Sequence, residues 1–278
     1  MAASAATVLL VDNGSLRPAA VRGLRRLAAT LGRRLGRPVE PVSLLYSDKV
    51  PAKALGGRPA ETLEPALRRR AAAGARDFLI VPLFLGRSQA ITKFLPASVA
   101  NVRRRYPDLR VRLAVPLAAT ADPRLVELLE AQVRARLKSA FLRGVKARVV
   151  LVDHGSPVRA VTQVRNRLAA QLRRRLGRAV AGVRAASMER RPGPAYAFNE
   201  PLLANLLATP PFNAGPVVVA QLFLLPGRHA GPDGDIAAIV RAARARQPRL
   251  RVARTRLLGD HPGLVEILAD RAARSRGV

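Results

Sequence analysis

The chain has 278 residues, 49% of them apolar, which is enough to bury a sizeable core in one large domain or two ordinary ones. This composition excludes a disordered protein, and the lack of a run of about 18 apolar residues excludes a membrane-spanning helix. The formal charge of +31 leaves three kinds of partner open: nucleic acid, an anionic membrane surface or an acidic small molecule.

The sequence contains no cysteine, which excludes disulfides, iron–sulfur clusters and thiolate zinc sites. Its first residues carry no basic segment ahead of an apolar one, so they do not predict a signal peptide, and we expect a cytoplasmic protein. Aromatic residues make up only 4%, and the arginines are spread along the expected helices, which argues against a nucleic-acid-binding module. We therefore expect most of the positive charge to be solvated helix surface, and the rest to attract a polyanionic ligand.

Apolar runs of strand length alternate with segments of helical spacing throughout the first half. The expected strands are 6–11, 39–46, 78–85 and 109–115, and the expected helices are 18–34, 61–73, 96–105 and 123–137. Continuous apolar strands in strict alternation with helices predict a parallel sheet that is covered on both faces.

The second half repeats this order of segments, and in places it also repeats the amino acids themselves. Its eight segments are 147–152, 159–176, 180–187, 201–207, 217–224, 235–246, 250–255 and 262–274. Leu83-Phe84-Leu85, for example, pairs with Leu222-Phe223-Leu224. An internal duplication of this length predicts two tandem α/β/α domains, 1–142 and 143–278, joined near 139–146 and each built on a parallel sheet of about four strands.

Ligands of open parallel sheets bind at the carboxyl ends of the strands, so the residues that follow each strand are the candidates for chemistry. After the first strand the two halves place Asn13 and His154, and after the second they place Asp48 and Glu189, which the same spacing aligns. The loop after the third strand of the second half ends in His229, whereas the first half contains no histidine. Two histidines and a carboxylate are therefore expected at one rim of the second half.

Neutral imidazoles with a carboxylate suit a borderline divalent transition metal, and the same groups can take up protons. The roles of two neighbouring features remain open. Gly155 and Ser156 either turn the chain and cap the next helix, or hold a ligand carboxylate with their amides. Arg228, beside His229 in a glycine-containing loop, is either a ligand contact or one more surface arginine.

At these positions the chain resembles the sirohydrochlorin chelatases, the class II metal chelatases of the cobalamin and sirohaem pathways, in their long duplicated form. The resemblance is carried by the turn Asp153-His154-Gly155-Ser156 and by the segment 223–229, which ends in Gly227-Arg228-His229. The family motif usually has glycine where this chain has Asp153. In the family the second motif is commonly followed by Asp-Ile-Pro. In this chain only Asp235-Ile236 is present, and it comes after an insertion.

The resemblance implies a lyase-type enzyme that inserts Co²⁺ or Fe²⁺, as a substrate, into a tetrapyrrole lying in the cleft between the two halves. It implies that His154 and His229 bind the metal and help to remove pyrrole protons, with Glu189 assisting. Substrate contacts are expected from Gly155, Ser156, Gly227 and Arg228. No organic cofactor is implied.

Because Asn13 stands where a histidine is expected, the first half is interpreted as a degenerate copy, with one active site per chain. We expect a monomer or weak homo-oligomer, since a duplication can replace a homodimer. The alternatives are a non-catalytic carrier of metal or tetrapyrrole and, on net charge alone, a nucleic-acid-binding module.

Overall fold

The computed structural model describes residues 6–118, 122–139 and 146–275. It contains two four-stranded parallel sheets, with strand orders β2-β1-β3-β4 and β6-β5-β7-β8. The strands are β1 Thr7–Asp12, β2 Val39–Ser43, β3 Asp77–Pro82, β4 Arg110–Leu113, β5 Arg148–Asp153, β6 Gly182–Ser187, β7 Gly215–Gln221 and β8 Leu250–Arg254. The α-helices are α1 Pro18–Leu35, α2 Leu63–Ala72, α3 Leu95–Arg103, α4 Arg124–Leu137, α5 Arg159–Leu176, α6 Leu203–Ala208, α7 Asp235–Arg246 and α8 Gly263–Ala273.

These elements confirm the predicted fold class of two α/β/α arrangements with parallel sheets. The middle strands are the most apolar because helices cover both of their faces. In β5, for example, every residue from Val149 to Val152 is fully buried. The two sheets have the same strand order, as an internal duplication requires.

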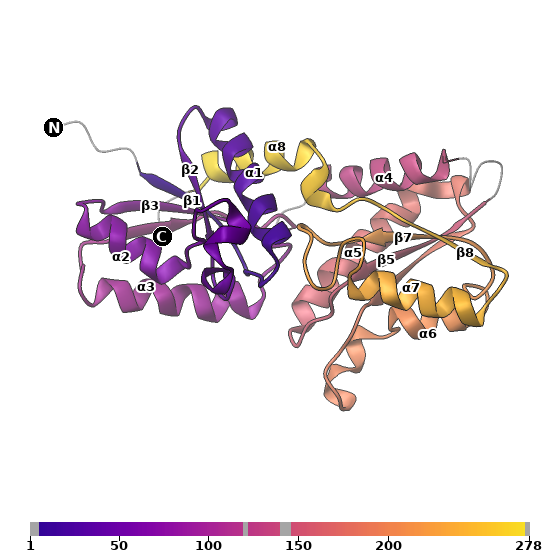
Figure 1. The fold of residues 1–278 in the computed structure, drawn as a ribbon. Helices are drawn as coiled ribbons and strands as arrows, with labels where there is room; N and C mark the ends of the chain where they lie inside the picture. The colour runs from indigo at the N-terminus through magenta and orange to yellow at the C-terminus, as the bar shows by residue number, and fades with distance from the viewer. Residues whose placement is uncertain (1–5, 119–121, 140–145, 276–278) are drawn as a thin grey trace. The chain divides into compact units, whose positions relative to one another are not determined.

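The division of the chain into compact units differs from the expected boundary between residues 142 and 143. One unit consists of residues 1–121 with 262–278, and the other of residues 122–261. The last helix, α8, packs against α1 and β3 of the first unit, and in Figure 1 this yellow helix lies among indigo elements. The helix expected to close the first domain, α4, instead packs against α5 and β7. The last helix of each half of the sequence therefore packs in the unit that contains the sheet of the other half.

Specific polar contacts accompany this exchange within each unit. In the first unit the side chain of Arg34 on α1 pairs with Glu266 on α8 at 2.9 Å. In the second unit the buried amide of Gln132 on α4 donates to the carbonyl of Leu257 at 3.0 Å. The joining segment expected near 139–146 lies mostly on residues 140–145, outside the described residues.

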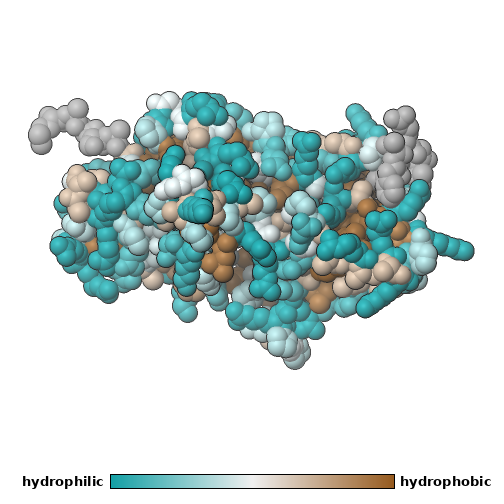
Figure 2. Space-filling view, in the orientation of Figure 1, coloured by the Kyte–Doolittle hydropathy of each residue, from teal (hydrophilic) through white to brown (hydrophobic). Residues whose placement is uncertain are grey.

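The surface of the molecule is strongly hydrophilic on the face shown in Figure 2, where the apolar residues form only small areas. Many arginines are paired with acidic side chains, such as Arg69 with Glu61 at 2.6 Å. With 49 basic and only 18 acidic residues, most of the positive charge has no acidic counterpart. No helix within the described ranges is long and apolar enough to cross a membrane.

Candidate metal centre

The carboxyl ends of β5, β6 and β7 lie at one rim of the second sheet, because all three strands are parallel. His154 directly follows β5, and Glu189 lies two residues after β6. The backbone N–H of Glu189 donates to the carbonyl of His154 at 3.1 Å, so these two strand ends remain hydrogen-bonded beyond the sheet. His229 lies in the loop between β7 and α7.

The imidazole of His154 faces the carboxylate of Glu189. Its Nε2 lies 3.1 Å from Glu189 Oε1, and its Nδ1 lies 3.0 Å from the carbonyl oxygen of Gly155. A carbonyl only accepts, so Nδ1 is the protonated nitrogen. In the neutral ring Nε2 then carries a lone pair directed toward an anionic oxygen. A proton or a metal cation between the two atoms relieves this repulsion, so the pair is suited to hold either.

The second histidine lies beside the first. The ring centroids of His154 and His229 are 4.4 Å apart, and the planes are tilted by 56°. His229 Nδ1 donates to Asp235 Oδ2 at 2.7 Å, at the first residue of α7. This bond fixes the tautomer and leaves Nε2 to bind a metal, an arrangement typical of carboxylate–histidine–metal sites. Sequence reasoning noted Asp235 only as part of a motif and gave it no role.

The three predicted ligands are therefore neighbours, although within the described part of the chain no group of three or more His, Cys, Asp or Glu side chains forms a ready-made metal cage. The side chains of His154 and Glu189 are 47% and 57% exposed, which leaves them room to turn. His229 is more confined, at 29% exposure. For all three side chains to hold one metal ion, His154 and Glu189 would have to turn toward the imidazole of His229.

The predicted substrate contacts differ in whether their hydrogen-bond donors are already used within the protein. The amide of Gly155 donates to Asp153 Oδ1 at 3.2 Å and the amide of Ser156 to Asn199 Oδ1 at 3.0 Å, so neither is available to a ligand carboxylate in this conformation. Ser156 Oγ accepts from the N–H of Val158, which is the chain-turning arrangement. The amide of Gly227 donates to the carbonyl of Ala230 at 2.8 Å.

Arg228 remains available to a ligand. Its side chain is 76% exposed, and its Nε lies 3.7 Å from Asp235 Oδ2, a loose contact for a guanidinium. An exposed arginine one residue before the candidate ligand His229 is well placed for an anionic group of a ligand.

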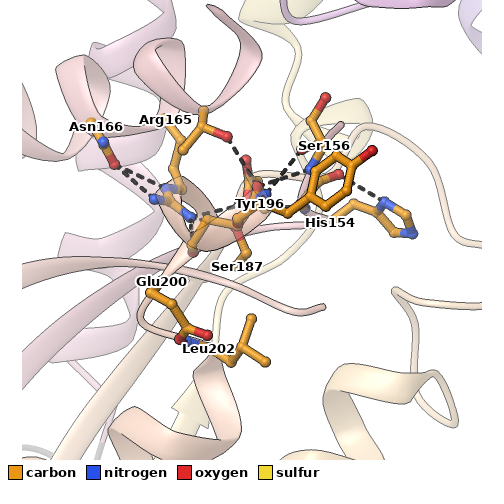
Figure 3. Close-up of polar contacts among 12 residues, drawn as sticks. His154, Ser156, Arg165, Asn166, Ser187, Tyr196, Glu200 and Leu202 are labelled. Carbon is orange, nitrogen blue, oxygen red and sulfur yellow. Dashed lines mark hydrogen bonds and ion pairs between the residues drawn. The ribbon is translucent and has the colours of Figure 1, made fainter. Parts of the chain in front are cut away.

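Asp153, the residue where the chain departs from the usual motif, is buried and bonded. Its Oδ1 accepts from Ser187 Oγ at 2.8 Å and lies 3.5 Å from Arg165 Nη1. Burial raises the pKa of Asp153, and the charge of Arg165 opposes this increase. Figure 3 shows Arg165 reaching toward Ser187, whereas the ring of His154 points away from them. Asp153 therefore belongs to a buried network behind the rim.

The first sheet does not offer these ligands at its corresponding rim. The amide of Leu45 donates to the carbonyl of Asn13, as the amide of Glu189 does to that of His154. Leu45, and not the expected Asp48, is thus the counterpart of Glu189. The expectation was wrong because β2 ends at Ser43 and β6 at Ser187, so the spacing between the copies changes before the rim. Asn13 and Leu45 make a poor metal site.

The first copy nevertheless keeps the buried acid. Asp12 accepts a hydrogen bond from Ser43 at 2.6 Å, and burial raises the pKa of Asp12 from 3.8 to about 6. Among the described residues of the first unit, no arginine is bonded to Asp12. The copies therefore share the carboxylate behind the rim and differ in what surrounds it.

Comparisons with known proteins identify a family and several solved structures of the same fold. The model of the CbiX family matches the chain twice, at residues 7–136 and 148–275. SirB from Bacillus subtilis, solved with Fe³⁺, has 20% sequence identity and a TM-score of 0.68, over 96% of this chain and 94% of that one. A sirohydrochlorin chelatase SirB from Bacillus subtilis subspecies spizizenii, in complex with cobalt, has 19% identity and a TM-score of 0.69, over 96% and 93%.

A third solved structure is CbiX, described as the terminal enzyme for biosynthesis of siroheme in denitrifying bacteria. It shares 20% identity and a TM-score of 0.64, over 95% of this chain and 97% of that one. No match was found among the curated protein sequences. At these identities the solved structures establish the fold, and they extend it over both halves of the chain.

Proposed function

Because the chain belongs to the CbiX family, we propose that it inserts a divalent metal ion, Co²⁺ or Fe²⁺, into sirohydrochlorin or a related tetrapyrrole. The observation that carries the proposal is the approach of His154 Nε2 to Glu189 Oε1 at 3.1 Å, with the ring of His229 at 4.4 Å from that of His154. SirB, which shares the fold, is a sirohydrochlorin chelatase solved with cobalt.

The reaction has two requirements that these residues can meet. The metal must be held and partly stripped of water, for which the Nε2 atoms of His154 and His229 and the carboxylate of Glu189 are suitable ligands. The two pyrrole N–H protons must also be removed, because the metal replaces them. Once the metal moves to the tetrapyrrole nitrogens, the imidazole of His154 and the carboxylate of Glu189 become free to accept these protons.

The charge of the protein suits a polycarboxylate substrate. Sirohydrochlorin carries many carboxylates, and a formal charge of +31 attracts it from a distance. Arg228, exposed beside the metal ligand His229, is the proposed close contact for one of these carboxylates. Gly227 contributes by placing Arg228 at the rim, since its amide is bonded within the loop.

A carrier that binds the metal without inserting it is the second candidate. It would use the same residues, because the approach of His154 Nε2 to Glu189 Oε1 at 3.1 Å suits the holding of a metal ion as well as its transfer. A carrier and a chelatase would both bind Co²⁺ through His154 and His229, but only a chelatase would convert free sirohydrochlorin to its metal complex.

An absorbance assay under anaerobic conditions separates the two. Purified protein is mixed with sirohydrochlorin and Co²⁺, Fe²⁺ or Ni²⁺ in turn, and the change in the tetrapyrrole spectrum is followed against the uncatalysed rate. We expect catalysed insertion of at least one of these metals. His154→Ala and His229→Ala should each lower the rate at least about 100-fold, since each removes both a ligand and a ring that orders the site.

Asn13→Ala is the matched control, because Asn13 is the counterpart of His154 at the other rim. It should change the rate by less than about twofold. Metal binding without turnover by the wild-type protein would identify a carrier. A loss in Asn13→Ala as large as that in His154→Ala would end the proposal of a single site in the second unit.

A further inference from the structure

Arg165 is a charged residue in the core of the second unit. It lies on α5, and only 1% of its surface is exposed. A buried guanidinium is costly unless its N–H groups are satisfied, and its presence calls for an explanation. Helices α1 and α5 have equal length and correspond residue by residue, which makes Leu24 the counterpart of Arg165. Leu24 is also buried, so the fold itself accepts an apolar side chain at this place.

The guanidinium joins the segments that carry two of the proposed metal ligands. Its Nη1 donates to Ser187 Oγ and to the carbonyl of Asn199 at 3.1 Å, and lies 3.5 Å from Asp153 Oδ1. Asp153 directly precedes His154, and Ser187 lies two residues before Glu189. One side chain thus fixes the end of β5 and the end of β6 relative to each other.

The opposite side of the same guanidinium is also fixed. Its Nε and Nη2 both donate to Asn166 Oδ1, at 3.0 and 2.9 Å, and Figure 3 shows these two converging bonds on the side away from Ser187. These bonds hold the plane of the guanidinium, so Nη1 is directed at the strand ends. Lysine has no such planar fork.

A second contact reaches the far side of the His154 turn. Asn199, whose carbonyl accepts from Arg165, is fully buried, and its side-chain Oδ1 accepts from the amide of Ser156 at 3.0 Å. Its Nδ2 donates back to the carbonyl of Ser156 at 3.0 Å. The turn that presents His154 is therefore anchored through Asp153 before it and through Ser156 after it, and both anchors meet at Arg165.

The first unit provides an internal comparison. It keeps the acid and the serine, because Ser43 Oγ donates to Asp12 Oδ1 at 2.6 Å. In the second unit Arg165 donates to Ser187 Oγ. The corresponding serine of the first unit, Ser43, accepts instead from Ser47 Oγ at 2.7 Å. The arginine thus occurs in the unit whose rim carries His154 and Glu189, and is replaced by leucine in the unit whose rim does not.

We propose that Arg165 is a positioning residue that sets the spacing between His154 and Glu189 for a divalent metal ion. The proposal rests on the proposed function for the identity of the cargo. Asp153 supplies the anion that makes the buried arginine tolerable, whereas Asp12 in the first unit is bonded to Ser43 alone among the side chains described there. Arg165 touches neither metal nor substrate and acts through the two strand ends.

The test removes both buried charges together in the double variant Asp153→Asn with Arg165→Leu, so that neither charge is left buried without its partner. The leucine is the residue that the first unit has at this place, so the variant should fold. Two readouts are taken. Calorimetry with Co²⁺ should give a Kd raised about 10- to 100-fold, as for other residues that orient metal ligands. Amide hydrogen exchange in the metal-free protein should show the Glu189 N–H, which donates to His154, exchanging at least about tenfold faster. Neither readout measures activity.

Arg271→Leu is the control for loss of a buried arginine. Arg271 lies on α8 of the first unit, is 3% exposed, and donates to the carbonyl of Leu117. This variant should lose stability while keeping the wild-type Kd for Co²⁺ and the wild-type exchange rate at Glu189. If the double variant does not fold, Arg165→Lys is used, which retains the charge without the fork and should show the same two changes to a smaller extent.

The proposal is overturned if a folded Arg165 variant keeps both the wild-type Kd and the wild-type exchange rate at Glu189. Failure of the proposed function gives a different result, in which the wild-type protein does not insert Co²⁺ into sirohydrochlorin, whether or not it binds the metal. The exchange measurement then still decides whether Arg165 holds the two strand ends together.

Discussion

The bond between Asp235 and His229 offers a sensitive test of how the metal centre is built. Asp235→Leu removes the acceptor at 2.7 Å from His229 Nδ1 and frees the ring to rotate and to change tautomer. Hydrogen bonds to charged groups contribute about 1.5–3 kcal/mol. The Asp235 side chain is 42% exposed, so solvent competes and lowers this contribution to about 1–2 kcal/mol. Each 1.4 kcal/mol is about tenfold in Kd.

We therefore expect Asp235→Leu to weaken Co²⁺ binding about 5- to 30-fold in a calorimetric titration. Asp235→Asn should lose less, because its amide oxygen still accepts from Nδ1 and holds the same tautomer. Asp233→Leu is the control, since it removes a carboxylate two residues away. A wild-type Kd in Asp235→Leu would show that His229 is not a ligand or needs no orientation, and the account of the site would have to change.

Two further predictions use the duplication as an internal control. A methyl group at Gly155 would lie 1.9 Å from the carbonyl oxygen of Glu189 at a φ of +95°, so Gly155→Ala should weaken Co²⁺ binding at least about tenfold, measured by calorimetry. Gly14→Ala, with a corresponding clash of 1.7 Å against Leu45, should destabilise the fold similarly but leave the affinity unchanged; equal losses of affinity would contradict the single-site account. Asp12→Asn tests the buried acid through urea unfolding at several pH values. Because the folded-state pKa of Asp12 is raised from 3.8 to about 6, the wild-type protein loses stability as the pH rises through this window. The free energy of unfolding of the variant, relative to that of the wild type, should therefore rise by about 2 kcal/mol between pH 4 and pH 7. A difference that does not vary with pH would refute the burial argument.

The fold was largely predictable because its signals are local and repeated. Continuous apolar runs such as 149–152 between amphipathic segments indicate parallel strands, and the second half repeats the first. The exchange of α4 and α8 could not be predicted in this way. A helix with Leu264, Ile267 and Leu268 on one face has the same pattern whichever sheet it covers.

The placement of the candidate site residues was predictable where it depends on strand ends, and the contacts in the interior behind them were missed. The closeness of His154, Glu189 and His229 follows from three parallel strands ending at one edge. The role of Arg165 was hidden because α5 is rich in arginine, and most arginines there are exposed. A signal was nevertheless present, since Arg165 falls on the apolar face of α5, between Thr162 and Leu168.

The pairing of Asp48 with Glu189 failed for a simpler reason. The two copies keep one spacing through α1 and α5, but the spacing changes by the ends of β2 and β6. Only the hydrogen bonds beyond the strands identify Leu45 as the true counterpart. The correction reinforces the interpretation of the first unit as one without metal ligands.

The central claim is that a single metal centre, in the second unit, is formed by His154, His229 and Glu189. The most direct measurement is a Co²⁺ titration of the wild-type chain, His154→Ala and Asn13→Ala, with the number bound taken from calorimetry and the ligands from the visible spectrum of bound Co²⁺. The account predicts one high-affinity Co²⁺ per chain, lost in His154→Ala and retained with the same spectrum in Asn13→Ala. Two equivalent ions per chain, or an unchanged spectrum in His154→Ala, would contradict it.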